Sequence, residues 1–124
     1  MASAPESHAW ELPGDLSAAA VARRHVEQFV GQAPYLDDAV LVASELVTNA
    51  VLHGKPPVTF ELTLLAEGVH MTVCDSGSGP ASSADSMPDV LTPTGRGRAL
   101  VARLAREHGS ARTSQGWETW AVVG

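Results

Sequence analysis

The segment between Pro34 and about His53 carries the longest regular pattern in the chain, and it constrains the fold most. Apolar side chains recur there at spacings of three and four, which predicts a helix with one buried face; they are Leu36, Val40, Ala43, Val47 and Ala50. Gly54 is placed as a left-handed terminator, and Pro56 prevents the helix from continuing. The pattern therefore predicts a long and largely apolar helix in the first half of the chain.

The patterns on either side of this helix predict further helices and strands. Alternating apolar and polar residues predict strands, and spacings of three and four predict helices. We expect a strand over 8–12, a helix from Asp15 or Ser17 to about Val30, an antiparallel pair of strands over 57–65 and 69–73, a helix from near 96–98 to Gly109, and a closing hairpin over 110–113 and 117–123. Helices and antiparallel strands in separate groups indicate an α+β sandwich.

Composition limits the class of protein. The 124 residues carry 8 basic and 14 acidic side chains, with a net charge of −6. This length suits one domain, predicted over 8–124 after a flexible tail at 1–7. The negative charge argues against direct nucleic-acid binding, and the single Cys74 can form neither an intramolecular disulfide nor a zinc site. Because we find no secretory signal and no membrane-spanning run, we expect a cytoplasmic protein that does not bind a membrane.

The first polar motif is a stripe along the long predicted helix. Glu45, Asn49 and His53 are four residues apart, so their side chains share one face. Such a stripe is either a solvated face, the ordinary location of a lone Glu or Asn, or the wall of a pocket. In a pocket, the carboxylate of Glu45 suits a general base, and the amide oxygen of Asn49 suits a hard cation that is already bound to phosphates.

Two glycine-rich motifs follow. Asp75, Gly77 and Gly79 stand after an apolar strand, where glycines let the backbone approach a ligand and the acid needs hydrogen-bond donors; ordinary turn chemistry is the alternative. The run over 94–98 (Thr-Gly-Arg-Gly-Arg) opens the last predicted helix, where free N–H groups bind anions; a flexible helix start is the alternative. It is neither a Walker A loop nor a dinucleotide fingerprint, because the only lysine precedes a proline and no βαβ unit is predicted.

The order of these motifs resembles a known family. Glu-x-x-x-Asn on a helix, Asp-x-Gly-x-Gly after a strand, a loop, and Gly-x-Gly opening a helix are similar to the ATP-binding domain shared by gyrase, the MutL repair protein, histidine kinases and certain chaperones, the GHKL or Bergerat-fold superfamily. Over about residues 8–123 the chain looks most like the small, single-domain anti-sigma-factor serine kinases and their actinobacterial relatives. The resemblance implies a mostly antiparallel mixed sheet covered on one face by about three helices, with an ATP lid at 80–94.

The resemblance also implies roles for individual residues, with ATP and Mg²⁺ as cofactors. Asn49 would ligate Mg²⁺ and Glu45 would be the catalytic base. Asp75 would accept the amino group of adenine, because a carboxylate repels the carbonyl oxygen that guanine carries there. The other nucleotide-binding residues implied are His53, Gly77, Gly79, Thr94, Gly95, Arg96, Gly97, Arg98 and Thr119. Arg98 stands where the family usually has a large apolar residue, and the lid is short and poor in glycine; both departures bear on catalysis more than on nucleotide binding.

The resulting hypothesis is an anti-sigma factor that is also a serine/threonine protein kinase. It would bind a sigma factor and phosphorylate a serine on an anti-anti-sigma antagonist, and the resemblance suggests a homodimer. The alternative is an ATP-sensing interaction module, catalytically weak or inactive, that regulates transcription through protein binding. A histidine autokinase and a gyrase- or MutL-like ATPase are disfavoured, because neither a phosphoacceptor helix pair nor a second domain is predicted.

Overall fold

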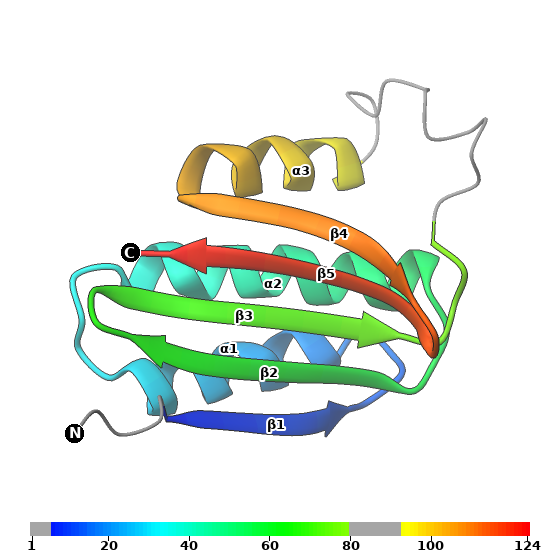
Figure 1. Ribbon diagram of the computed structural model, residues 1–124, viewed down its shortest axis with the longest axis horizontal. Coiled ribbons are helices and arrows are strands. Elements are labelled where there is room, and N and C mark those ends of the chain that lie inside the picture. Colours follow the sequence, from blue (N-terminus) through cyan, green and yellow to red (C-terminus); the bar gives the residue numbers. More distant parts are fainter. Residues whose placement is uncertain (1–5, 80–92) are drawn as a thin grey trace.

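The computed structural model describes residues 6–79 and 93–124, which form one sheet with a layer of helices (Figure 1). The strands are β1 (Ser7–Leu12), β2 (Val58–Leu65), β3 (Gly68–Asp75), β4 (Glu107–Thr113) and β5 (Gly116–Val123); the helices are α1 (Ala18–Val30), α2 (Leu36–His53) and α3 (Pro93–Leu104). The strand order is β1-β2-β3-β5-β4, and every pairing among the described residues is antiparallel. This arrangement confirms the predicted α+β sandwich.

Helix α2 forms the centre of the helical layer. It packs against α1 and α3 and covers β2, β3 and β5. Its buried face consists of Ala39, Val42, Ala43, Leu46, Val47 and Ala50. The sheet beneath contributes Phe60, Leu62 and Met71, all fully buried, and each such side chain stabilises the fold by roughly 1.5–3 kcal/mol. No helix in the described part of the chain is both long and apolar enough to cross a membrane.

The third helix differs most from its prediction. Helix α3 begins at Pro93, before the expected start at 96–98, because the fixed φ and missing N–H of proline suit the first position of a helix. It also ends before Gly109, since residues 107–113 form the edge strand β4 and pair with β5. Gly109 lies beside the ring of Trp120, where a Cβ atom would come within 3.0 Å of the indole. Strand pairing therefore replaces the last turn of the expected helix.

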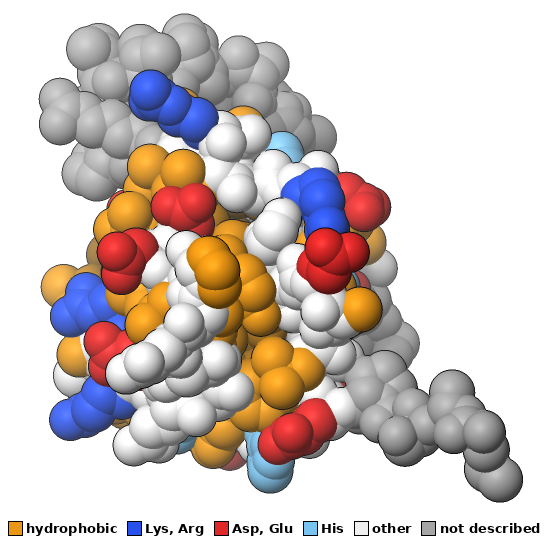
Figure 2. Space-filling model, turned by 90° about the vertical axis from the view of Figure 1, so that its left-hand side faces the viewer, with side chains coloured by type: hydrophobic (Ala, Val, Ile, Leu, Met, Phe, Trp, Pro, Cys, Tyr) orange, Lys and Arg blue, Asp and Glu red, His pale blue; other side chains and the backbone are white. Residues whose placement is uncertain are grey.

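The two ends of the sheet differ in character. One end carries the β2–β3 turn and the C-terminus (Figure 1). Figure 2 shows this end, with hydrophobic side chains gathered along its middle and charged side chains around them; Leu65, the last residue of β2, is among the exposed large hydrophobic residues. The end of α2 and the end of β3 lie at the other end of the sheet (Figure 1), where the polar motifs are found.

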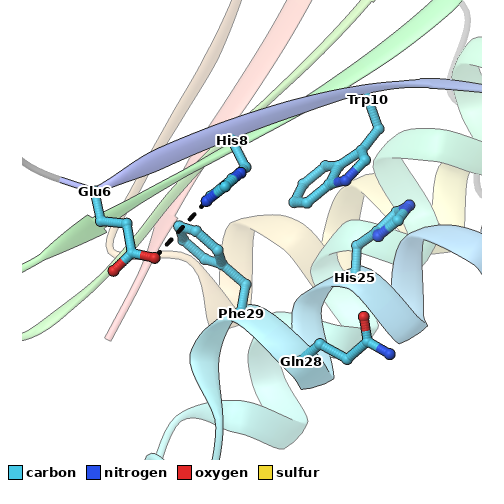
Figure 3. A pocket seen from close by; sticks show the side chains of 6 residues that line it. All are labelled: Glu6, His8, Trp10, His25, Gln28 and Phe29. Atoms are coloured by element: carbon cyan, nitrogen blue, oxygen red, sulfur yellow. Dashed lines mark ion pairs between the residues drawn. The ribbon is translucent and has the colours of Figure 1, made fainter.

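An aromatic cluster fills the edge between β1 and α1. The ring of Trp10 stacks on His25 with the ring centroids 4.0 Å apart, and Phe29 meets Trp10 edge-on at 6.4 Å. These side chains, with Glu6, His8 and Gln28, line a shallow cavity of about 370 Å³ (Figure 3). Hydrophobic and stacking contacts therefore attach the first strand to the first helix.

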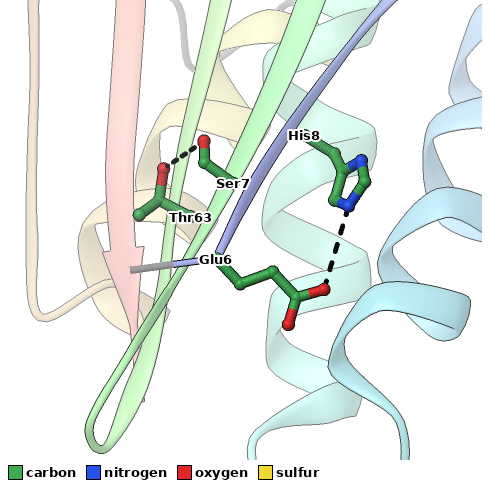
Figure 4. A network of polar contacts seen from close by, with 4 residues as sticks. All are labelled: Glu6, Ser7, His8 and Thr63. Atoms are coloured by element: carbon green, nitrogen blue, oxygen red, sulfur yellow. Dashed lines mark hydrogen bonds and ion pairs between the residues drawn. The ribbon is translucent and has the colours of Figure 1, made fainter. Parts of the chain in front are cut away.

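Polar contacts order the start of the same strand. Glu6 pairs with His8, with 3.8 Å between Oε2 and Nε2, and the Ser7 and Thr63 hydroxyls lie 3.0 Å apart (Figure 4). The backbone N–H of Leu64 also donates to the carbonyl oxygen of Glu6 at 2.8 Å. Strand β1 consequently starts at Ser7, one residue earlier than the predicted strand, inside the segment expected to be a tail.

The stack on Trp10 predicts a loss of stability in acid. Burial of the imidazole, followed by the charge of Arg24, lowers the pKa of His25. The imidazole of His25 therefore binds a proton more readily in the unfolded chain than in the folded protein. Its contribution to stability is present above the unfolded pKa of about 6.5 and is lost as the pH falls through the folded pKa. We expect the free energy of unfolding to fall more steeply from about pH 7.5 to about pH 5 in the parent than in His25→Phe, which keeps a ring on Trp10. Urea unfolding followed by circular dichroism measures this; parallel pH curves would contradict it.

Candidate functional site

Asp75 is the centre of the site. It is the last residue of β3 and follows the alternation that turns Met71 and Val73 into the core, so its carboxylate points towards the helices. Its exposure is 7%, and it is the only buried charged side chain among the described residues. The Oδ1 atom accepts hydrogen bonds from the backbone N–H of Gly77 at 2.7 Å and of Lys55 at 3.4 Å. Both bonds end on Oδ1, so Oδ2 keeps acceptor capacity for a ligand.

Gly54 brings the end of α2 against this carboxylate. The prediction of a left-handed terminator is wrong, because the φ of Gly54 is −97°. The reason for glycine is space: a Cβ atom there would lie 2.3 Å from the Asp75 Cγ. The absent side chain therefore lets the end of α2, the helix that carries the Glu45-Asn49-His53 stripe, lie against the end of β3.

Ser76 fixes the turn that follows Asp75, a role that the sequence analysis missed. Its N–H donates to the carbonyl oxygen of Lys55 at 2.9 Å. Its hydroxyl donates to the carbonyl oxygens of Pro56 at 2.6 Å and Lys55 at 3.2 Å. These bonds connect the end of β3 to the loop after α2. A serine beside an aspartate is also common in ordinary turns, so the sequence offered no signal that could separate the two roles.

The glycines of the turn lie close to their neighbours. Gly77 is buried, and a Cβ atom there would lie 2.9 Å from the Asp75 Oδ1. Gly79 has a φ of +82°, and a Cβ atom there would lie 2.4 Å from the ring of Trp117. The described neighbours that these glycines approach are the side chains of Asp75 and Trp117, and the approach of this backbone to a ligand stays a prediction.

The stripe on α2 divides into half-buried and exposed positions. Glu45 and Asn49 are half-buried, whereas His53, in the last turn, is exposed. The Asn49 Oδ1 atom is buried and has no hydrogen-bond partner in the described part of the protein. An unpaired buried amide oxygen costs free energy, so such an atom calls for a ligand.

The remaining predicted site residues lie on β5 and α3. Thr119 pairs with Val73 of β3 and lies on the same face of β5 as Trp117. The backbone of Thr94, Gly95, Arg96 and Gly97 belongs to the first turns of α3, and their side chains lie outside the description. Arg98 is exposed. Of the predicted lid, 80–92 lies outside the described residues. Helix α3 packs against α2, so the first turn of α3 and the polar stripe on α2 belong to the same layer of helices.

These residues fit a magnesium nucleotide better than a metal held by protein alone. The described residues contain no group of three or more His, Cys, Asp or Glu side chains placed to hold an ion. A single amide oxygen at Asn49 suits Mg²⁺, because this ion takes most of its ligands from phosphates and water. The free N–H groups of a helix start, as in α3, suit phosphate.

A second cavity, of about 410 Å³, lies behind Asp75, where it is lined by Thr59, Cys74 and Glu118 among others. Burial, with a smaller effect of the nearby Glu118, raises the pKa of Cys74. The thiol therefore stays protonated at neutral pH, and a protonated thiol is a poor nucleophile.

The packing around Asp75 predicts a large cost for a side chain at Gly116. This glycine has a φ of +149°, and a Cβ atom there would lie 2.0 Å from the carbonyl oxygen of Asp75. Gly31 offers a matched control, since its φ is +74° but no atom of the described residues, apart from Gly31 and its chain neighbours, lies within 4 Å of its Cβ position. We expect Gly31→Ala to destabilise the fold by about 1 kcal/mol and Gly116→Ala by about 3 kcal/mol or more. Equal losses in thermal or urea unfolding would contradict the close approach.

Comparisons with known proteins identify the family and support the fold. The family model described as the histidine kinase-like ATPase domain matches residues 10–123. Among solved structures, the fold is similar to the histidine kinase domain of the blue-light activated histidine kinase EL346 of Erythrobacter litoralis, with a TM-score of 0.58 and 19% identity. The match covers 87% of this chain and 59% of that one, so this chain spans less than two thirds of the solved relative. No curated protein sequence matches. The chain belongs to the histidine kinase-like ATPase domain family, as its resemblance to the GHKL superfamily had indicated.

Proposed function

We propose that this protein binds Mg²⁺-ATP beside α2, which packs against both β3 and α3, and transfers the γ-phosphoryl group to a serine of another protein. The observation that carries the proposal is the buried amide oxygen of Asn49, which has no hydrogen-bond partner among the described residues and lies on the helix whose end touches the Asp75 carboxylate. An acceptor for adenine and a ligand for a phosphate-bound cation on adjoining elements match the two ends of ATP. The family match supports nucleotide binding and phosphotransfer in general.

Asp75 is proposed to select the base. Its Oδ1 atom is occupied by the N–H groups of Gly77 and Lys55, which hold the carboxylate in one orientation. Its Oδ2 atom would accept from the 6-amino group of adenine and would repel the carbonyl oxygen of guanine. Thr119 of β5 lies on the same face of the sheet as Asp75, because its pairing partner Val73 stands two residues before Asp75 on β3.

Asn49 and the start of α3 are proposed to receive the phosphates. Mg²⁺, when bound, neutralises charge on the phosphate oxygens during phosphoryl transfer. Asn49 would hold this ion through Oδ1, and the N–H groups of residues 94–97 would contact the phosphates. Arg98, which is exposed, would add positive charge nearby.

Glu45 is proposed as the general base. It lies one turn before Asn49 on the same face of α2 and is half-buried. Its carboxylate would take the proton from the attacking serine hydroxyl, the role that a positioned carboxylate performs in other phosphotransferases. His53, exposed at the end of the same stripe, would lie at the rim of the site.

A regulatory partner completes the proposal. The acceptor serine is proposed to lie on another protein, an anti-anti-sigma antagonist, and a sigma factor is the proposed target of inhibition. The support for these partners is the resemblance of the motif set to anti-sigma-factor kinases; a homodimer is proposed on the same ground. Recovering a sigma factor or an antagonist with the native protein, or failing to, tests them.

A second function remains a candidate because of Arg98. This residue stands where the resemblance leads us to expect a large apolar side chain, and it is exposed. An altered helix start would affect alignment of the γ-phosphoryl group more than binding of the base. The second function is thus an ATP-sensing module that regulates a partner by binding and transfers phosphate slowly or not at all.

Base selection predicts a specific effect of Asp75→Asn. The amide oxygen can still accept from Gly77 and Lys55, but its NH₂ group replaces the second acceptor. We expect the preference for ATP over GTP to fall about tenfold to hundredfold, since a hydrogen bond to a charged group contributes about 1.5–3 kcal/mol. Calorimetric titration with Mg²⁺ and either nucleotide measures this. Asp38→Asn, exposed in the first turn of α2, is the control; unchanged selectivity in Asp75→Asn would refute the adenine role.

The proposed role of Glu45 as general base predicts a different effect of Glu45→Gln. Without a base, transfer of labelled γ-phosphate to an antagonist protein should fall by about 10²–10⁴-fold, while ATP affinity stays near that of the parent. If Glu45→Gln transfers label as fast as the parent, Glu45 is not the base. If the parent binds ATP but transfers nothing to an authentic antagonist, the sensing module is the function.

A further inference from the structure

The turn from Asp75 to Gly79 is fixed from two sides. On one side, Ser76 donates to the carbonyl oxygens of Lys55 and Pro56, and Gly54 adjoins the Asp75 carboxylate. On the other side stands β5, whose residue Trp117 is paired with Asp75. Within the described residues, the hydrogen bonds that hold this turn reach as far as Gly77, and Gly79 is located by packing alone.

Trp117 supplies that packing. An ideal Cβ atom on Gly79 would lie 2.4 Å from Cε3, 2.6 Å from Cδ2 and 2.8 Å from Cζ3 of Trp117. These three atoms belong to the six-membered ring of the indole, so the bare Cα of Gly79 lies against that ring. Gly79 has a φ of +82°, which an L side chain rarely adopts. Position 79 thus requires glycine both for its backbone and for its contact with Trp117.

The position of Trp117 is itself constrained by the backbone. Its neighbour Gly116 lies so close to Asp75 that a Cβ atom would be 2.0 Å from the Asp75 carbonyl oxygen. Trp117 is half-buried and pairs with Asp75 on one side and with Arg112 of β4 on the other. A rigid ring on a strand that is paired on both sides is a stable support for a turn that leaves the sheet.

We propose that Trp117 is a positioning residue for nucleotide selection: its indole supports Gly79 and thereby keeps the Gly77 N–H on the Asp75 carboxylate. This inference rests on the proposed ATP-binding function and adds a residue to it that belongs to none of the three motifs. Loss of the ring lets Gly79 shift, and the Gly77–Asp75 hydrogen bond weakens with it. Asp75 then presents its second oxygen to adenine less reproducibly.

Trp120 provides a matched control. It lies on the same strand, but three residues later and therefore on the other face, where its ring stacks on His70 with centroids 5.8 Å apart. It is half-buried like Trp117. Replacing Trp120 by Leu removes a ring of the same size from the same strand and leaves the contact with Gly79 intact.

The first measurement needs no nucleotide. Hydrogen exchange of the Gly77 amide, followed by NMR, reports its bond to Asp75 directly. We expect Trp117→Leu to accelerate this exchange about tenfold relative to Trp120→Leu, the effect of roughly 1.4 kcal/mol on local opening. If Trp117→Leu does not fold, the milder pair Trp117→Phe and Trp120→Phe gives the same comparison, with faster Gly77 exchange expected in Trp117→Phe alone. Equal exchange in the matched variants overturns the proposal.

The second measurement adds nucleotide. Trp117→Leu should bind ATP about tenfold more weakly than Trp120→Leu and discriminate less against GTP, whereas Trp117→Phe should recover most of the affinity. Equal affinity and selectivity in the two Leu variants also overturn the proposal, even where their melting temperatures differ. A parent protein that binds no ATP defeats the proposed function, and the Gly77 exchange rates then decide separately whether Trp117 holds the turn.

Discussion

The contact between Gly54 and the Asp75 carboxylate determines how the two layers of this protein meet. A buried carboxylate is costly unless donors surround it, and here the N–H groups of Lys55 and Gly77 fill that role. The backbone N–H of Lys55 can reach the Asp75 Oδ1 only because Gly54, the preceding residue, has no side chain that would separate α2 from β3. One missing methyl group therefore decides both the packing of the layers and the orientation of the acid.

The site builds outward from this contact. Ser76 ties the turn to the loop after α2, and Trp117 supports its far end at Gly79. The turn is thus held between the end of α2 and strand β5, and both elements contribute other residues to the buried core. Asn49, whose amide oxygen has no hydrogen-bond partner within residues 6–79 and 93–124, lies on the same helix. Rigid elements on both sides suit a site that must distinguish one base from another.

Much of this could be predicted because the signals are local. The apolar spacing on α2, the alternation in β2 and β3, and the Asp75-x-Gly77-x-Gly79 spacing each reflect neighbouring residues in the chain. The early end of α3 could not be predicted in the same way, because pairing of β4 with β5 competes with the helix. Its start at Pro93 reflects a local preference of proline for the first helical position, which the prediction missed. The roles assigned to Glu45, Asp75 and the phosphate-contacting residues stay predictions, which measurements of nucleotide binding and phosphoryl transfer test.

The sequence by itself determined the class of fold, which follows from periodicity within short segments, and the order of the motifs, whose resemblance to a known superfamily indicated the family. Only the tertiary structure decided why Gly54 is glycine, and that Ser76 and Trp117 hold the Asp75 turn. The physical reason is distance along the chain, because Gly54 and Trp117 are about twenty and forty residues from the turn that they contact. Close packing between such distant segments produces no periodic pattern in the sequence of either one.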